Sequence, residues 1–296
     1  MTHPLFTPQR RALLQGAAAL AAASALPAFA QGQPRAPRLI TVGGGITEVV
    51  YALGAQDQLV GTDTTSLYPA AALATPKVGY MRQLSAEGLL SLRPDAVIAQ
   101  GDAGPPVVLD QLRSAGVKVD LLPITHDWAE VRGKVLAVGR AAAKERSARE
   151  LLATLDAQWE QTQQRVKAHQ GTPPRVLFVL AHSGSPMVAG EATAANALIG
   201  FAGARNALSG FKGYRPMTAE AMAAAAPDVI LTTTQGIEAI GGEATFWRRP
   251  EVQLTPAWQR RDSGRALVHL DALELLGFGP RMPGVVAGLH QRLVAA

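Results

Sequence analysis

Tyr80 is followed two residues later by Arg82, and this pair has the chemistry of a metal-binding group. A phenolate oxygen is a good ligand for ferric iron, which is a hard Lewis acid. Free tyrosine has a pKa of about 10, so its ionisation at neutral pH requires help from the metal and from a nearby positive charge. Arg82 can supply that charge. The alternative is a tyrosine that covers the edge of a lobe, beside a solvated arginine.

Tyr214 and Arg215 form a second pair of the same residue types, and Pro216 follows them. The backbone before a proline is confined to extended or turn conformations, which suits the rim of a cleft. An ordinary loop is the alternative interpretation of this segment.

His182 is the histidine best placed to bind a ligand, because it follows the strand predicted at residues 175–181. Ligands of open α/β sheets bind at the ends of strands. A lone histidine, however, more often serves as a structural hydrogen-bonding group. The other histidines of the mature chain are dispersed and show no spacing typical of a zinc or manganese site; they are His126, His169, His269 and His290.

Two segments resemble enzyme motifs without completing them. The glycines at 43–45 follow a predicted strand but lack the Gly-Lys-Ser/Thr ending of a phosphate loop. Residues 183–185 lack the Gly-x-Ser-x-Gly pattern of hydrolases. No nucleophile–base–orienter set and no paired carboxylate motif is visible, so the sequence predicts that the chain is not an enzyme.

One arrangement of residues occurs twice, at 85–94 and at 218–227. In each segment a serine or threonine suited to capping a helix is followed two residues later by a glutamate, and a proline follows that glutamate by seven residues. The glutamates, Glu87 and Glu220, fall in the first turn of each predicted helix, where an acid stabilises the helix dipole by about 0.3–1 kcal/mol. The repeat predicts two similar lobes that face one cleft.

Seven short apolar runs rich in β-branched residues predict buried strands, and helical patterns lie between most of them. This alternation predicts an α/β fold with two Rossmann-like lobes and mostly parallel sheets. The predicted strands lie at residues 38–42, 58–61, 96–100, 117–121, 175–181, 228–233 and 266–270.

The middle of the chain has helical patterns only. Asp127 with Glu130 three residues later predicts a helix start, and Gly139 predicts a break or a weak point. Apolar residues follow helical spacing from 144 to 167. Such a helix is about 36 Å long at about 1.5 Å per residue, which suits a long backbone helix that joins two lobes. One more surface helix is the alternative.

The composition limits the class of protein. The chain has 296 residues, of which 48% are hydrophobic, and this is enough for two domains with their own cores. It has no cysteine, which excludes disulfides, cysteine-ligated metal sites and a lipid anchor on an N-terminal cysteine. The net charge is +5, a weak indication of an anionic ligand, and no lysine and arginine run suggests a nucleic-acid binder.

Residues 1–30 have the features of a signal peptide. Arg10 and Arg11 precede leucines and an alanine-rich apolar stretch, and the segment ends in the small-x-small sequence Ala28-Phe29-Ala30. The paired arginines resemble a twin-arginine export signal. An ordinary secretory signal or an uncleaved anchor is the alternative. We expect cleavage near Ala30 and a mature protein in the periplasm.

Five segments carry a resemblance to a known family. They are Ile-Thr-Val-Gly-Gly-Gly-Ile-Thr-Glu at 40–48, Val-Gly-Tyr-Met-Arg at 78–82, Ala-His-Ser-Gly at 181–184, Tyr-Arg-Pro at 214–216 and Leu-Leu-Gly-Phe-Gly at 275–279. The chain resembles the helical-backbone periplasmic binding proteins, which serve cobalamin, siderophore and haem importers. Gly-Tyr-Met-Arg with a later Tyr-Arg-Pro is similar more specifically to the haemin-binding proteins of haemin ABC importers. The resemblance covers essentially the whole mature chain.

The resemblance implies a role for each candidate residue. Tyr80 matches the axial ligand of the haem iron in the family, and Arg82 matches the arginine that supports it. Tyr214 is expected to pack on the porphyrin, and Arg215 is expected to pair with a propionate. His182 matches a histidine that contacts a second, stacked haem in some relatives.

The resemblance also implies partners and an organisation. Glu87 and Glu220 match acids that dock on arginines of the two permease subunits. The expected partners are haem as a non-covalent ligand, an ABC permease dimer of the cytoplasmic membrane and an outer-membrane haem receptor system, with no nucleic acid. The expected parts are a signal peptide (1–30), an N-terminal lobe (31–126), a helical segment (127–172) and a C-terminal lobe (173–296). The alternatives are the same fold with a ferric siderophore or cobalamin, or a haem-modifying or hydrolytic enzyme.

Overall fold

The computed structural model describes residues 35–180 and 186–294. Two compact units divide the chain, Met1–Ala36 and Pro37–Ala296, and every helix and strand described below belongs to the second unit. The predicted signal peptide and its cleavage site lie outside the described residues. None of the described helices combines the length and the apolar character that a membrane span requires.

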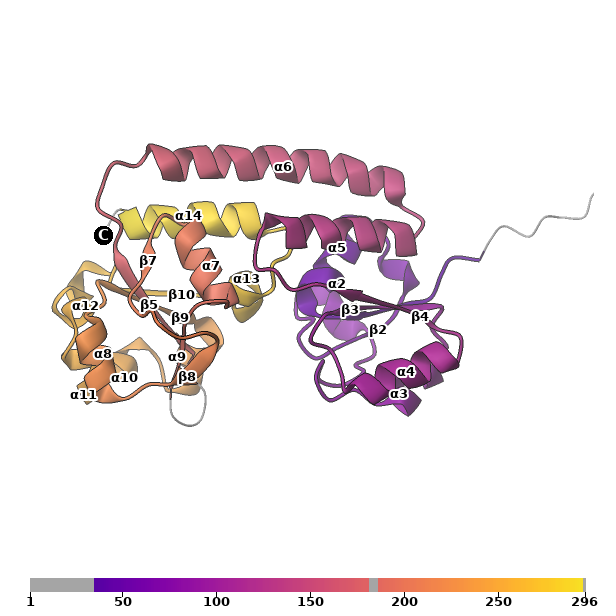
Figure 1. The fold of residues 1–296 in the computed structure, drawn as a ribbon, viewed down its shortest axis with the longest axis horizontal. Helices are drawn as coiled ribbons and strands as arrows, with labels where there is room; N and C mark the ends of the chain where they lie inside the picture. Colours follow the sequence, from indigo (N-terminus) through magenta and orange to yellow (C-terminus); the bar gives the residue numbers. More distant parts are fainter. Residues whose placement is uncertain (1–34, 181–185, 295–296) are drawn as a thin grey trace, which may run out of the picture. The chain divides into compact units, whose positions relative to one another are not determined.

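The N-terminal lobe is built on a four-stranded sheet with the strand order β2-β1-β3-β4 (Figure 1). All its strands are parallel, and each lies within one residue of its predicted position. They are β1 (Leu39–Val42), β2 (Leu59–Thr62), β3 (Ala96–Gln100) and β4 (Lys118–Leu122). The helices of this lobe are α2 (Gly44–Ala52), α3 (Ala86–Ser91) and α4 (Pro106–Ser114), with short 3-10 helices at Gln56–Gln58 and Ala70–Ala74.

The C-terminal lobe is built on a second sheet with the order β10-β9-β5-β6-β8, in which β7 also pairs with β5. The predicted strands β5 (Arg175–Leu180), β9 (Val229–Thr233) and β10 (Leu267–Leu270) are parallel to one another. The sequence did not predict β6 (Met187–Ala189), β7 (Arg205–Asn206) and β8 (Tyr214–Pro216), which are too short to show an alternating pattern. The Tyr-Arg-Pro segment is β8, and it pairs antiparallel with β6.

Alternate residues of the second sheet point to opposite faces and enter two separate hydrophobic clusters. Phe178 and Leu231 lie in the cluster that includes α7 and α14, whereas Leu177 and Ile230 lie in the cluster that includes α8. Helices therefore cover both faces, as a parallel sheet requires. The helices of this lobe are α7 (Ala194–Phe201), α8 (Ala219–Ala225), α9 (Thr234–Ala239), α10 (Glu243–Trp247), α11 (Pro250–Gln253), α12 (Pro256–Gln259), α13 (Ala272–Leu276) and α14 (Met282–Val294), with a 3-10 helix at Arg261–Ser263.

The helix α5 (Trp128–Ala141) begins where the sequence predicts. The Asp127 side chain caps it by accepting a hydrogen bond from the Glu130 backbone N–H at 3.0 Å. The prediction of a break at Gly139 is wrong, because α5 continues through that residue. A Cβ atom at Gly139 would lie 2.5 Å from the Cβ of Ala148 in the next helix. The glycine thus allows two helices to approach closely.

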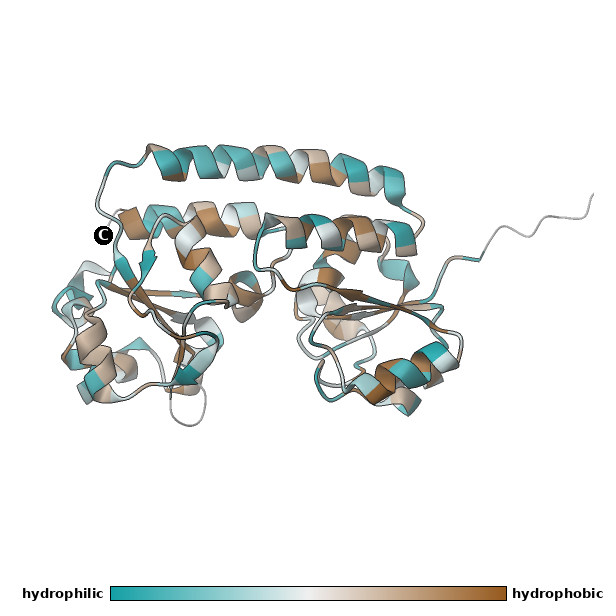
Figure 2. Ribbon diagram, in the orientation of Figure 1, coloured by the Kyte–Doolittle hydropathy of each residue, from teal (hydrophilic) through white to brown (hydrophobic). Residues whose placement is uncertain are grey.

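The helix α6 (Glu145–Ala168) confirms the long helix predicted at 144–167. It packs against α5 of the preceding segment and against α14 of the C-terminal lobe (Figure 1). Trp159 stacks on Trp128 with ring centroids 4.9 Å apart, and its edge meets Phe201. Figure 2 shows α6 as mostly hydrophilic and the strands as mostly hydrophobic. The helix contributes a narrow apolar side to the cores of both lobes.

A buried lysine connects the helical segment to the C-terminal lobe. Lys134 of α5 is 1% exposed and forms an ion pair with Glu130 at 2.7 Å. Its ammonium group also donates to the backbone carbonyls of Gly277 and Phe278, at 2.9 and 3.1 Å. Each donor of this buried cation therefore has an acceptor, which a charge in a low-dielectric interior requires.

Two of the segments that carry the resemblance contact each other. A Cβ atom at Gly45 would collide with the Gly277 carbonyl oxygen, so the first turn of α2 packs directly on the 275–279 segment. Beside it, the Glu48 carboxylate accepts two hydrogen bonds from Arg281, at 2.9 and 2.8 Å. The glycine-rich start of α2 is thus a packing surface between the lobes.

Candidate functional site

Tyr80 lies in the loop between β2 and α3, and 40% of its surface is exposed. Gly79 precedes it with a φ of +99°, a backbone conformation that favours glycine. The Tyr80 carbonyl accepts a hydrogen bond from the Gln83 backbone N–H at 2.8 Å, which closes a tight turn. Met81 and Leu84 are buried in the core of the N-terminal lobe. The loop therefore presents Tyr80 outward while its neighbours anchor it.

Arg82 connects Tyr80 to an acid. One terminal nitrogen of its guanidinium donates to the Tyr80 hydroxyl, and the other donates to a carboxylate oxygen of Asp102. Partial burial alone would lower the pKa of Arg82, but the charge of Asp102 and the hydrogen bonds raise it above its ordinary value. Arg82 is therefore a permanent cation beside the phenol, as the sequence predicts.

Asp102 is a site residue that was not predicted from the sequence. This residue follows β3 by two positions, at the edge where the carboxyl ends of the parallel strands meet. Ligands of open α/β sheets bind at that edge. A carboxylate directly after a buried strand is the sequence signal that could have identified it.

Tyr214 lies in β8 of the other lobe and has 39% of its surface exposed. Its ring meets Phe178 edge to face at 6.4 Å. Burial raises the pKa of the phenol, against the opposing effects of the Ala195 backbone, the Thr193 side chain and the charge of Arg82. The charge of Arg82, which bonds the Tyr80 hydroxyl, thus also acts on the pKa of Tyr214.

Arg215 lies on the opposite face of β8, because neighbouring residues of a strand point in opposite directions. Its guanidinium stacks over the ring of Phe211, 3.8 Å from the ring centroid. Among the described contacts, none joins Arg215 to Tyr80 or Arg82.

His182 lies outside the described residues, so its predicted role stays a prediction. Within residues 35–180 and 186–294, no group of three histidine, aspartate or glutamate side chains could hold a metal ion. The described histidines have structural partners; for example, His290 contacts the Ala202 carbonyl oxygen at 2.9 Å.

Glu87 and Glu220 lie in the first turns of α3 and α8, as the sequence repeat predicts. Ser85 and Thr218 cap these helices through their side chains. Both glutamates are exposed. Bonds to its own backbone N–H and to the Thr218 hydroxyl lower the pKa of Glu220. Each lobe therefore carries one solvated acid at an equivalent position.

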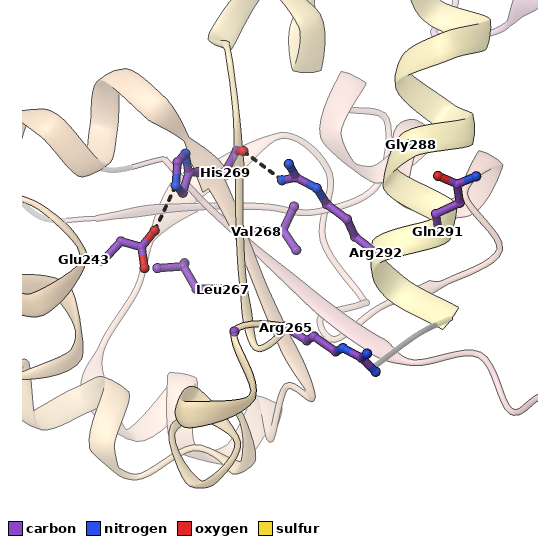
Figure 3. A pocket seen from close by; sticks show the side chains of 9 residues that line it. Glu243, Arg265, Leu267, Val268, His269, Gly288, Gln291 and Arg292 are labelled. Atoms are coloured by element: carbon purple, nitrogen blue, oxygen red, sulfur yellow. Dashed lines mark hydrogen bonds and ion pairs between the residues drawn. The ribbon is translucent and has the colours of Figure 1, made fainter.

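A cavity of about 570 Å³ lies elsewhere, beside β10 and α14 (Figure 3). There, the His269 ring is hydrogen-bonded to the Glu243 carboxylate at 3.0 Å. The Arg292 guanidinium donates to the His269 backbone carbonyl at 3.4 Å. The described lining of this cavity contains none of the predicted site residues.

Comparisons with known proteins agree with the two-lobed fold. A family model of periplasmic binding proteins matches residues 39–262. Among solved structures, the periplasmic heme-binding protein BhuT in complex with two hemes is 47% identical, with a TM-score of 0.82. That match covers 88% of this chain and 98% of the BhuT chain.

Curated relatives match over shorter regions. The uncharacterized ABC transporter substrate-binding lipoprotein YvrC of Bacillus subtilis (strain 168) is 27% identical over 196 residues, which is 65% of this chain and 62% of the relative. The vitamin B12-binding protein of Vibrio cholerae serotype O1 (strain ATCC 39541 / Classical Ogawa 395 / O395) is 36% identical over 84 residues, which is 28% of this chain and 30% of the relative. The matches thus span less than two thirds of these curated relatives. Since the family model covers most of the chain, and the two-lobed α/β fold with its connecting helix matches nearly all of BhuT, the chain belongs to the periplasmic binding protein family.

Proposed function

We propose that this chain is a periplasmic haem-binding protein that holds haem against Tyr80 and delivers it to an ABC permease. The observation that carries the proposal is the hydrogen bond by which the Arg82 guanidinium is held against the Tyr80 hydroxyl. The 47% identity to BhuT, whose structure contains two hemes, supports haem as the ligand. The family transports its ligands and does not convert them, so the prediction that the chain is not an enzyme is confirmed.

In this proposal, Tyr80 binds the ferric iron through its phenolate oxygen. The iron and the nearby Arg82 cation both favour the ionised phenol. Tyr214 covers the porphyrin from the other lobe with its ring. Arg215 pairs with a propionate through the N–H groups at the edge of its guanidinium, while the face stacks over Phe211.

A titration of the purified protein with haemin tests the ligand assignment. The wild type should give a new Soret band together with a tyrosinate-to-iron charge-transfer band. Tyr80→Phe removes the phenol oxygen, so we expect it to lose the charge-transfer band and at least tenfold in affinity. Tyr214→Phe removes a hydroxyl from a tyrosine of nearly equal exposure, 39% against 40%, and should keep the band. A wild-type spectrum from Tyr80→Phe would exclude Tyr80 as the ligand.

The same titration addresses the second haem. We propose that His182 contacts it, by analogy with the two hemes of the BhuT structure. The endpoint should then be two haems for the wild type and one for His182→Ala. An endpoint of one for both proteins would remove His182 from the site.

A cobalamin or a ferric siderophore is the second candidate ligand, because the vitamin B12-binding relative matches part of the chain. Neither ligand offers an open iron position to a tyrosine, so neither should give a charge-transfer band that depends on Tyr80. Tighter binding of either ligand than of haemin would replace haem in the proposal.

The partners follow from the same assignment. We propose that Glu87 and Glu220 dock on arginines of an ABC permease dimer, with an outer-membrane haem receptor system supplying the ligand. Both acids are exposed and occupy equivalent positions of the two lobes, which suits a partner of matching symmetry. Changing both to alanine should reduce haem import by the reconstituted permease while haem affinity stays the same. Glu150→Ala, at an exposed acid of α6, is the matched control.

We also propose that the protein reaches the periplasm by cleavage of residues 1–30. Mass spectrometry of the periplasmic protein should then find an N-terminus near Gln31. The division into lobes at 31–126 and 173–296, with a helical segment between them, stays a prediction.

A further inference from the structure

We propose that Asp102 is a positioning residue that holds the Arg82 guanidinium against the Tyr80 oxygen. The inference rests on the proposed function, because Tyr80 is the residue whose oxygen is thereby prepared for iron. Asp102 itself does not touch Tyr80 in the described hydrogen bonds. It acts through Arg82, which bridges the two side chains.

The loop that carries Asp102 is fixed to the loop that carries Tyr80. The Gly104 backbone N–H donates to the Met81 carbonyl at 2.9 Å, and the Leu84 backbone N–H donates to the Gly104 carbonyl at 2.9 Å. These two bonds lie on either side of Arg82 in the sequence. The Asp102 loop also packs closely on the end of β4, since a Cβ atom at Gly101 would lie 2.8 Å from the Leu122 carbonyl oxygen. The carboxylate is therefore presented at a defined place relative to the tyrosine.

Arg82 needs such a partner because its side chain is long and half exposed, at 51%. An arginine in that situation samples many rotamers, and only a few of them direct a nitrogen at the phenol. Its planar guanidinium can serve two acceptors at once through separate nitrogens. When one terminal nitrogen is bound by Asp102, the other is directed at Tyr80.

The carboxylate makes no other described hydrogen bond, although its charge also acts on the pKa of the buried Lys134. Its second oxygen, Oδ1, is buried and has no hydrogen-bond partner among the described residues. An aspartate that supports a loop usually accepts bonds from nearby backbone N–H groups, as Asp63 does from Gly43 and Thr65. The described hydrogen bonds of the Asp102 side chain go to Arg82 alone. The described side-chain hydrogen bonds therefore tie Asp102 to Arg82 and not to the backbone of its own loop.

A set of variants tests whether Asp102 acts through Arg82. The proteins are the wild type, Arg82→Ala, Asp102→Ala, the double variant, and Asp102→Glu. Haem is loaded, and its dissociation rate is measured by transfer to an excess of apomyoglobin, while the tyrosinate charge-transfer band is recorded. We expect Arg82→Ala and Asp102→Ala to raise the dissociation rate in the same direction, each by at least threefold, and to change the charge-transfer band alike. Asp102→Glu should restore part of the wild-type behaviour.

The double variant carries the decisive comparison. If Asp102 acts only through Arg82, its loss has no further effect once Arg82 is absent, and the double variant matches Arg82→Ala within about twofold. Asp110→Ala, which breaks an exposed 2.8 Å pair with Arg113 in the same lobe, is the matched control and should match the wild type. Should Asp102→Ala fail to fold, Asp102→Asn replaces it, since it keeps the shape and removes the charge.

The outcomes separate this inference from the proposed function. If Tyr80→Phe loses the charge-transfer band and Arg82→Ala speeds dissociation, but Asp102→Ala behaves as the wild type, only the role of Asp102 is overturned. Effects of Arg82→Ala and Asp102→Ala that multiply in the double variant also overturn it. If Tyr80→Phe keeps the wild-type spectrum, the ligand assignment fails and the inference falls with it.

Discussion

Tyr80 and Tyr214 have nearly equal exposure, yet their hydroxyl groups lie in different surroundings. The Tyr214 oxygen lies at the start of α7, against the Ala195 backbone and the Thr193 side chain. The described hydrogen bond of the Tyr80 oxygen comes from Arg82 alone. A phenolate can accept that bond and still offer a lone pair to iron. This difference favours Tyr80 as the ligand and Tyr214 as a covering ring.

Asp127 provides a prediction that depends on pH. A hydrogen bond from the Thr125 hydroxyl, and a further one from the Glu130 backbone, lower the pKa of this carboxylate. The stability it contributes is therefore present above its unfolded pKa of about 3.9 and is lost as the pH falls through the lower folded pKa. Asp127→Ala should cost about 1 kcal/mol of unfolding free energy at pH 7. Urea unfolding should show that this cost shrinks below about pH 4.

Asp127→Asn is the control, because asparagine caps a helix without a titrating group. It should unfold close to the wild type at pH 7, and at pH 3 it should keep the advantage over Asp127→Ala that the wild type loses. An equal cost of Asp127→Ala at pH 7 and pH 3 would show that the carboxylate charge does not matter at this cap.

Residues close together in one loop could be predicted from the sequence, and distant partners could not. The spacing of Tyr80 and Arg82 suffices to pair a phenol with a cation. Asp102 joins them from twenty residues further on, because the β3 loop folds beside theirs. The direction of Arg215 depends on β8, whose three residues give no periodic pattern.

At the scale of elements, two glycines of α5 allow a matched pair of substitutions that tests its packing on α6. Gly139 faces Ala148 of α6, and a Cβ atom there would lie 2.5 Å from the Ala148 Cβ. Gly139→Ala should therefore destabilise the protein by about 1–3 kcal/mol through overpacking. Gly133 is exposed in the same helix with nothing within 4 Å of an added Cβ, so Gly133→Ala should stabilise by up to about 1 kcal/mol.

Urea denaturation of the two variants measures both effects. Equal stability of Gly139→Ala and Gly133→Ala would show that α5 and α6 do not pack as closely as described. The sequence could predict both helices from their periodicity and their caps. The sequence could not show whether Gly139 breaks a helix or allows another helix to pack closely on it. That depends on how α6 packs against α5, which no local pattern reveals.

At the scale of the whole second unit, an ion pair spans the two lobes. Arg281 of the C-terminal lobe holds Glu48, which is 5% exposed, and also binds Glu274 at 2.8 Å. Burial raises the pKa of Glu48 even though Arg281 opposes this shift. Contacts of this kind join residues far apart in the sequence, 233 positions in this case, and no local pattern predicts them.

Arg281→Met should be strongly destabilising, because it leaves the buried Glu48 without its cation. We expect a loss of about 3 kcal/mol, partly limited by protonation of the carboxylate. Arg146→Met breaks an exposed pair with Glu150 and should cost less than about 1 kcal/mol. Thermal or urea unfolding of both variants checks the difference. A similar small loss for both would indicate that the lobes are held together mainly by apolar packing.

Tyr80, Arg82 and Asp102 all lie in the N-terminal lobe, and this matters for successive cycles of binding and release. Their loops are tied to each other by backbone bonds and depend on one sheet, whereas Tyr214 comes from the other sheet. Under the proposed function, a permease that parts the lobes would withdraw Tyr214 and leave Tyr80, Arg82 and Asp102 assembled. The emptied carrier would then need no internal rebuilding before its next round.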